Sequence, residues 1–224
     1  MNLTLISYAQ TSNGDSPETF KRTEPLLLSD LQMQSRLYSA LDPPADDPYY
    51  LENLIATARD FFESETQIQL LTATWELRLD GFPRSGEPIY LPLPPVREVL
   101  SLKYIDTDGT EQTLFDSTVS PAIDAGIFVA DLKSPVRPQA GEIYLAYGQS
   151  WPTARWEKNA VRIQFQGGFG DTSADVPAGI KQTLMVMAAT LYRHREAVIV
   201  GTIQSDIEFF RSLLDRWRWR RPVF

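Results

Sequence analysis

Two short stretches of the sequence carry residues that could bind an ion or a phosphate. Residues 106–109 read D-T-D-G, like the start of a calcium loop, but the further ligands and the glutamate twelve residues along are absent. We therefore interpret them as the turn of a β-hairpin. Residues 167–170 read G-G-F-G and lack the lysine and the spacing of a phosphate loop. This pattern favours a glycine-rich bend.

Catalytic chemistry has little support in the sequence. The one histidine, His194, lies in the stretch R-H-R-E. A lone histidine in such a stretch is more often a surface residue at the end of a helix than a catalytic residue. The chain has no cysteine, which excludes thiol nucleophiles and disulfides, and a single histidine excludes a multi-histidine metal site within one subunit. Enzymes that use a pair of carboxylates have no clear sequence motif, so this class of enzyme remains an open alternative. We predict no enzyme and no cofactor.

The C-terminal segment is the sharpest feature of the sequence. It holds four arginines and no acidic residue, while the whole chain carries a net charge of −8, and aromatic residues stand between the arginines. Arginine with aromatic residues is typical of binding anchors. Three interpretations stay open: packing on its own subunit, gripping nucleic acid, and docking in an acidic, apolar groove of a partner. The segment comprises Arg216, Trp217, Arg218, Trp219, Arg220, Arg221, Pro222, Val223 and Phe224.

A helix is predicted over residues 176–198. Pro177 suits its first turn, and apolar residues recur at spacings of three and four. The middle is apolar nearly all round, which predicts that other elements or another subunit enclose it. We therefore predict a contact between subunits through Leu184, Met185, Met187, Ala188 and Leu191, with Arg193, Arg195 and Glu196 at its rim.

Further helices are predicted at 26–40 and 48–67, with a helical seam at 203–217. Alternating residues predict a strand at 72–80, and several short strands follow as far as residue 166. The predicted fold class is α+β: a helical bundle built from N- and C-terminal helices, with a small antiparallel β unit inserted. The predicted parts are an N-terminal arm (1–25), the first half of the helical part (26–72), the β insertion (73–170), the second half of the helical part (171–215) and the basic aromatic tail (216–224).

Composition limits the class of protein. A hydrophobic fraction of 43% is enough for a core, and the acidic balance argues against a protein whose main task is gripping the phosphate backbone. No apolar run is long enough to span a bilayer, and the N-terminus lacks the features of a secretion signal. We expect a cytosolic protein without a membrane partner.

Several motifs occur in an order that resembles one known family. They are E-P-L-L-L-S-D-L, L-I-A-T-A-R-D-F-F-E-S-E-T, T-W-E-L-R-L-D-G-F-P, I-Y-L-P-L-P-P-V, the D-T-D-G-T hairpin, Q-S-W-P, N-A-V-R-I-Q-F-Q-G-G-F-G, V-P-A-G-I-K-Q and Y-R-H-R-E, and they cover residues 24 to 200. In this order the chain resembles the head–tail connector (adaptor) proteins of tailed bacteriophages and prophages. The C-terminal tail lies outside the resemblance.

The resemblance implies a structural virion protein. Such connectors form a ring, usually of twelve copies, under the portal in the virion neck, and assemble in the host cytoplasm. They join the DNA-filled head to a tail-side neck or stopper protein, and double-stranded DNA passes through the middle. In such proteins a C-terminal segment contacts the portal. Because residues 216–224 are basic and aromatic while the rest of the chain is acidic, we expect them to dock on the portal. The alternative is a nucleic-acid-binding module acting through the same Arg/Trp tail.

Overall fold

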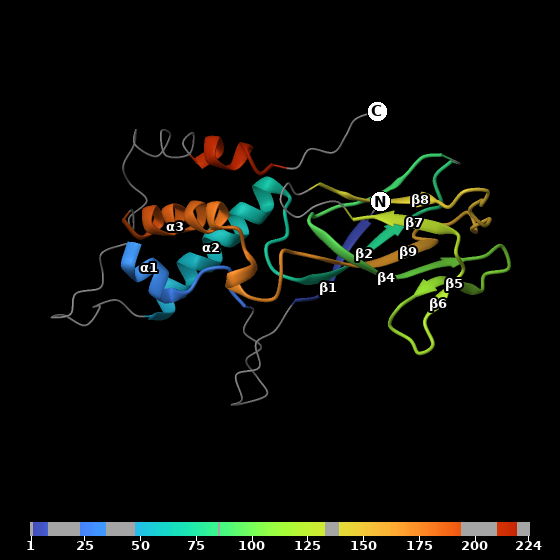
Figure 1. Ribbon diagram of the computed structural model, residues 1–224, viewed down its shortest axis with the longest axis horizontal. Helices are drawn as coiled ribbons and strands as arrows, with labels where there is room; N and C mark the ends of the chain where they lie inside the picture. Colours follow the sequence, from blue (N-terminus) through green and yellow to red (C-terminus); the bar gives the residue numbers. More distant parts are fainter. Residues whose placement is uncertain are drawn as a thin grey trace. The chain divides into compact units, whose positions relative to one another are not determined.

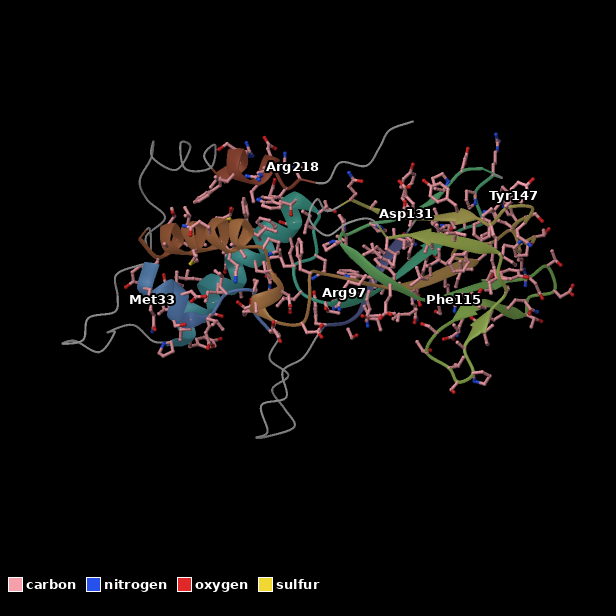
Figure 2. The ribbon with its side chains drawn as sticks, viewed as in Figure 1. Met33, Arg97, Phe115, Asp131, Tyr147 and Arg218 are labelled. Carbon is pink, nitrogen blue, oxygen red and sulfur yellow. The ribbon has the colours of Figure 1, made fainter. Side chains whose placement is uncertain are left out.

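The computed structural model describes residues 2–8, 23–34, 48–84, 86–132, 139–193 and 210–218. These fall into two compact units, shown with their elements in Figure 1 and with side chains in Figure 2. The β unit contains the described residues of 1–9 and 72–168, and the helical unit contains those of 10–71 and 169–222. Each unit is therefore built from segments that lie far apart in the sequence.

The β unit consists of two antiparallel sheets. One has six strands in the order β1 (Asn2–Tyr8), β2 (Ala73–Leu79), β9 (Val161–Gly167), β4 (Val96–Ile105), β5 (Glu111–Asp116) and β6 (Ile123–Asp124). The other has three strands in the order β3 (Ile89–Leu91), β8 (Gly141–Leu145) and β7 (Phe128–Asp131).

Alternation along the strands builds the core of the β unit. In β9, Val161, Ile163 and Phe165 are fully buried, while the residues between them are partly exposed. These side chains join one buried cluster with Leu91 and Ile143 of the three-stranded sheet. The two sheets therefore share a core, and each such buried side chain contributes roughly 1.5–3 kcal/mol relative to an exposed one.

The opposite face of the six-stranded sheet is polar, and Glu76 on β2 is one of its buried charges, at 9% exposure. Gln164 Nε2 donates to Glu76 Oε2 at 3.1 Å, and Arg78 Nε donates to Oε1 at 2.5 Å. Burial by itself raises the pKa of Glu76, but these two hydrogen bonds, with the charges of Arg78 and Arg162, hold the pKa below its ordinary value. The carboxylate is therefore ionised and paired, as a buried charge must be.

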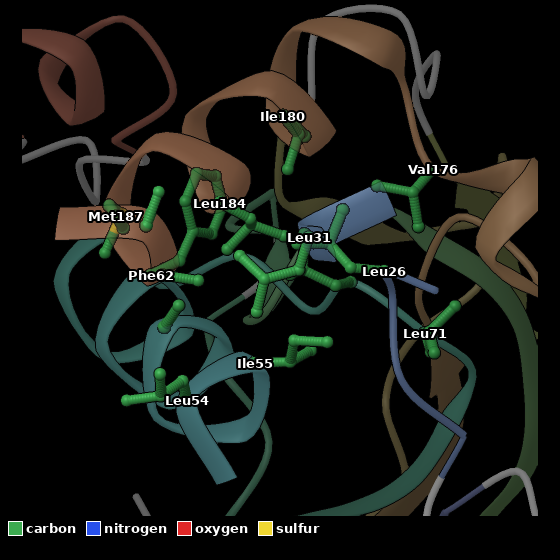
Figure 3. Packing of buried hydrophobic residues seen from close by; sticks show 14 of the residues in the cluster. Leu26, Leu31, Leu54, Ile55, Phe62, Leu71, Val176, Ile180, Leu184 and Met187 are labelled. Atoms are coloured by element: carbon green, nitrogen blue, oxygen red, sulfur yellow. The ribbon is translucent and has the colours of Figure 1, made fainter. Parts of the chain in front are cut away.

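The helical unit contains α1 (Leu28–Gln34), α2 (Pro48–Thr66), a 3-10 turn (Ser173–Asp175), α3 (Ala178–Arg193) and helical residues at 210–215. Helix α2 buries an apolar stripe that includes Leu51, Ile55 and Phe62. Figure 3 shows this stripe facing Ile180, Leu184 and Met187 of α3, and all of these side chains belong to one cluster. The unit is thus held by the apolar faces of two helices.

The predicted helical bundle is wrong. The described chain is a mixed α+β protein with a dominant six-stranded sheet and a second three-stranded sheet, and in that part of the chain only α2 and α3 are substantial helices. Helix α1 is described over seven residues, and residues 2–8 form β1 at the edge of the large sheet. Because the strands enclose a core of their own, the β part is a second unit with its own packing rather than an insertion decorating a bundle.

Replacing the paired carboxylate of Glu76 tests the polar face of the sheet. Because its pKa is lower in the folded than in the unfolded chain, the stabilisation is complete at neutral pH and is lost as the pH falls through the folded value. We expect Glu76→Gln to lower the free energy of unfolding by about 1–3 kcal/mol at pH 7. The difference in the free energy of unfolding between this variant and the wild type should become smaller below about pH 4.

Urea unfolding at pH 7 and pH 3 measures this difference. Glu98→Gln, on an exposed position of β4, is the matched control and should change stability by less than about 0.5 kcal/mol. A gap between wild type and Glu76→Gln that stays constant over this pH range would contradict the assigned pairing.

Candidate functional site

The base of the C-terminal segment packs on its own helical unit. Leu214 is fully buried, and Trp217 lies half-buried against the same core. A Cβ atom added at Gly179, in the first turn of α3, would lie 3.3 Å from Trp217 Cζ2. Gly179 therefore leaves room for the close approach of the indole ring to the helix.

Arg218 fixes this base to the end of α2 (Figure 2). Its Nε donates to the carbonyl oxygen of Glu65 at 3.1 Å, and its Nη2 donates to the Glu65 carboxylate at 2.9 Å. Its Nη1 donates to Asp215 at 3.0 Å. Since Glu65 lies in the last turn of α2, the guanidinium both pairs with a carboxylate and meets the negative end of the helix dipole. We call Trp217 and Arg218 the C-terminal anchor.

The structure places only part of the predicted portal-docking segment. Arg216 is exposed, with its Cζ atom 5.5 Å from the centroid of the Trp217 ring. Of the three interpretations of the segment, packing on its own subunit therefore holds for its first residues, through Trp217 and Arg218. Portal docking by the segment stays a prediction. The remaining members, Trp219, Arg220, Arg221, Pro222, Val223 and Phe224, lie outside the described residues.

The residues predicted to contact a second subunit divide into two groups. Leu184, Met187 and Ala188 are buried in the core of their own helical unit. Met185 is partly buried and Leu191 is 39% exposed, so these two retain surface for a partner. The side chain of Arg193, and all of Arg195 and Glu196, lie outside the described residues, as does His194. The contact between subunits stays a prediction.

The D-T-D-G stretch is the turn of the β4–β5 hairpin, as predicted. The Asp106 carboxylate accepts the side-chain amide of Gln112 at 2.9 Å and the backbone N–H groups of Thr110 and Asp108 at 2.9 Å and 3.0 Å. The hydrogen bond from Gln112, followed by that from Thr110, lowers the pKa of Asp106. The carboxylate serves the turn, as aspartate commonly does.

The G-G-F-G stretch is a bend, as predicted. The Gly168 N–H donates to Pro95 O at 2.8 Å, and the Phe169 N–H donates to Leu70 O at 3.0 Å, so both groups are used by the chain itself. Within the described residues, no group of three or more histidine, cysteine, aspartate or glutamate side chains could hold a metal ion. None of the helices described is both long and apolar enough to cross a membrane.

One surface was missed at the level of sequence. In the β unit, residues 80–83 and 151–158 line a groove of about 830 Å³, which we call the aromatic groove. Trp156 in its lining is fully exposed. Tyr147, which is nearby in the sequence and labelled in Figure 2, is fully exposed as well. Aromatic residues within the turn-rich run from G-Q-S-W-P to R-W-E-K were the available signal. Large exposed aromatics mark interaction surfaces.

Comparisons with solved structures find chains of the same fold. A chain of the "virion of native gene transfer agent (GTA) particle" matches with a TM-score of 0.69 and 21% identity. Chains from the "neck of empty GTA particle computed with C6 symmetry" and the "neck of native GTA particle computed with C12 symmetry" match with TM-scores of 0.69 and 0.61, both at 22% identity. Each match covers 100% of this chain and 98% of the other. No protein-family model and no curated protein matches.

Truncating the two leucines of α3 distinguishes core from surface. Leu184→Ala should lower the free energy of unfolding by about 2–5 kcal/mol, because it opens a cavity in the core. Leu191→Ala, on the same helix but 39% exposed, should cost less than about 1 kcal/mol. Urea unfolding of the dilute protein gives both values. Equal losses would contradict the burial assigned to these positions.

Removing the guanidinium of the C-terminal anchor should loosen the end of the chain. Because the contacts are partly exposed, we expect Arg218→Ala to cost only about 0.5–1.5 kcal/mol. Amide hydrogen exchange at residues 214–218 should become faster. Arg216→Ala, which leaves the anchor intact, is the control. Exchange that is equally fast in both variants would mean that Arg218 does not hold the segment.

Proposed function

We propose that this protein is a structural component of the neck of a phage-like particle: a connector that forms a ring under the portal. In this role it joins the DNA-filled head to the tail or to the next neck protein, and the ring leaves a passage for double-stranded DNA. The finished protein resides in the virion neck, and its partners are further copies of itself, the portal and a tail-side neck protein.

The observation that carries the proposal is the likeness of fold over the whole chain to chains of gene transfer agent necks. It agrees with the motif order that resembles phage connectors, two independent routes to the same class of protein. The C12 symmetry of one of those necks supports a ring of twelve copies. The acidic balance of the chain suits a passage for DNA, since a wall of like charge does not hold the phosphate backbone.

Portal docking is assigned to the end of the chain beyond the C-terminal anchor. The anchor fixes the point at which the segment leaves the helical unit, and Arg216 remains exposed beside it. Residues 219–224 add two further arginines and two aromatic side chains. A short basic aromatic segment that starts from a fixed point loses less entropy on docking than one that hangs from a loose helix.

The test is electron microscopy of the protein mixed with its portal. We expect a closed ring seated on the portal, with the mass of the complex giving the copy number. A chain that ends at Arg218 keeps the anchor and should fold normally but fail to co-purify with the portal. A monomer both alone and with the portal would overturn the proposal. Salt-sensitive binding of the free protein to DNA, without a ring, would favour the nucleic-acid-binding alternative instead.

A further inference from the structure

The aromatic groove of the β unit has a frame that is fixed before any partner binds. The Arg155 N–H donates to Ile105 O at 2.9 Å, and Ala154 forms a β-bridge with Asp106. The Asn159 N–H donates to the Asp80 carboxylate at 3.0 Å. Both walls of the groove are therefore tied to the strands of the large sheet. A surface held in this way loses little entropy when a ligand binds.

The lining of this groove is aromatic and proline-rich. Phe82 stacks on Trp151 with ring centroids 4.7 Å apart and planes 6° apart. Pro83 and Pro152 flank this stack, and the fully exposed Trp156 completes the lining. Flat aromatic and proline surfaces of this kind bind extended, proline-containing segments in the polyproline II conformation. Exposed tryptophan is also the residue type most enriched among the binding hot spots of interfaces.

Among the described residues, one buried donor of the groove has no hydrogen-bond partner and one of its cations has no ion-pair partner. The indole N–H of Trp151 is buried and has no hydrogen-bond partner in the described chain, although a buried tryptophan N–H normally has one. The Glu157 carboxylate pairs with Arg155 at 3.3 Å, and Asp80 accepts the Asn159 N–H. Lys158 is exposed and forms no ion pair within the described residues. A ligand that brings a negative charge to Lys158 therefore fits this groove.

The chain itself contains a segment with this chemistry. Residues 42–47 read D-P-P-A-D-D, between α1 and α2, and they lie outside the described residues. Two adjacent prolines favour the polyproline II conformation, and the carbonyl groups of that conformation point outward and carry no internal hydrogen bonds. Three aspartates supply the negative charge that suits Lys158. The composition of the segment therefore suits the aromatic, proline-rich lining of the groove and its lysine.

We infer that the aromatic groove of one copy binds residues 42–47 of a second copy. The contact stacks the two prolines on Trp156 and Trp151 and sets an aspartate beside Lys158. The inference rests on the proposed ring, since neighbouring copies must stand side by side. It adds to the ring a specific junction made of a rigid receptor on the β unit and a linear ligand from the helical unit.

Peptide binding tests the receptor without requiring a ring. A fluorescent peptide of residues 40–49 is titrated into the full chain and followed by anisotropy. We expect saturable binding that Trp156→Ala weakens about tenfold or more, and that Lys158→Gln weakens while reducing its dependence on salt. Tyr147→Ala removes an equally exposed aromatic side chain outside the groove and should leave binding unchanged. No binding, or equal loss with Tyr147→Ala, would overturn the inference.

Cross-linking tests whether the segment comes from a second copy. The natural chain has no cysteine, so Thr153→Cys in the groove lining and Ala45→Cys in the segment introduce single thiols while keeping Lys158 and the three aspartates. The two variants are mixed, assembled and treated with a short bis-maleimide, and the expected product is a covalent dimer. Tyr147→Cys with Ala45→Cys is the control pair and should give little dimer.

The cross-linking outcomes separate this inference from the proposed function. A double variant, Thr153→Cys with Ala45→Cys in one chain, that links only within itself would overturn binding between copies. A ring seen by microscopy without cross-linking or peptide binding would leave the proposed function standing and remove this junction. Peptide binding that depends on Trp156, in a protein that forms no ring, would support the groove as a receptor and count against the ring.

Discussion

The contact between α2 and α3 is the interaction on which the helical unit depends. Both helices bury apolar faces in one cluster, in which Phe62 and Ile180 are fully enclosed. Helix α1 and the helical residues at 210–215 contribute Leu31 and Leu214 to the same cluster. The C-terminal anchor uses the two helices again, because Arg218 binds the last turn of α2 and Trp217 lies over Gly179 of α3. Loss of the α2–α3 contact would therefore also release the end of the chain.

In the β unit the constraint is different, because the two faces of the six-stranded sheet are not equivalent. One face of the large sheet is closed by the core it shares with the small sheet, and the central strand β9 alternates strictly between buried and partly exposed residues. The other face pairs its charges, as Glu76 does with Arg78 and Gln164. The loops of the β unit remain available to a partner, and hydrogen bonds to the strands hold them in place. The exposed Trp156 lies in one of these loops. A rigid sheet that positions exposed loop residues is a common arrangement for recognition.

Local periodicity predicted the elements better than the architecture. The alternation around Trp75 and the stripe of α2 marked a strand and a helix correctly, because both patterns record one buried face. How many strands share a sheet is set by contacts across the chain. For example, β1 pairs with β2 across about seventy residues of sequence, and no spacing rule reports that pairing. The apolar excess of α3 predicts a subunit contact, which stays a prediction, and part of that excess, Leu184 and Met187, is buried within the helical unit itself. Periodicity shows that a face is covered but does not identify what covers it.

Charge places a limit on how such subunits assemble. Each copy carries −8, so the proposed ring would accumulate repulsion between copies that only short-range contacts could overcome. At physiological ionic strength, charges separated by more than about 8 Å are largely screened, and aromatic contacts at the junctions then decide the assembly. Under the inferred junction, the exposed Trp156 would provide such a contact, and Lys158, which forms no ion pair with any described residue, would supply a positive charge for an acidic neighbour. Under the proposed portal docking, the arginines at the end of the chain would play the same part for a different partner. An acidic body with small basic aromatic sites favours ordered docking over general aggregation, because most encounters between copies are repulsive.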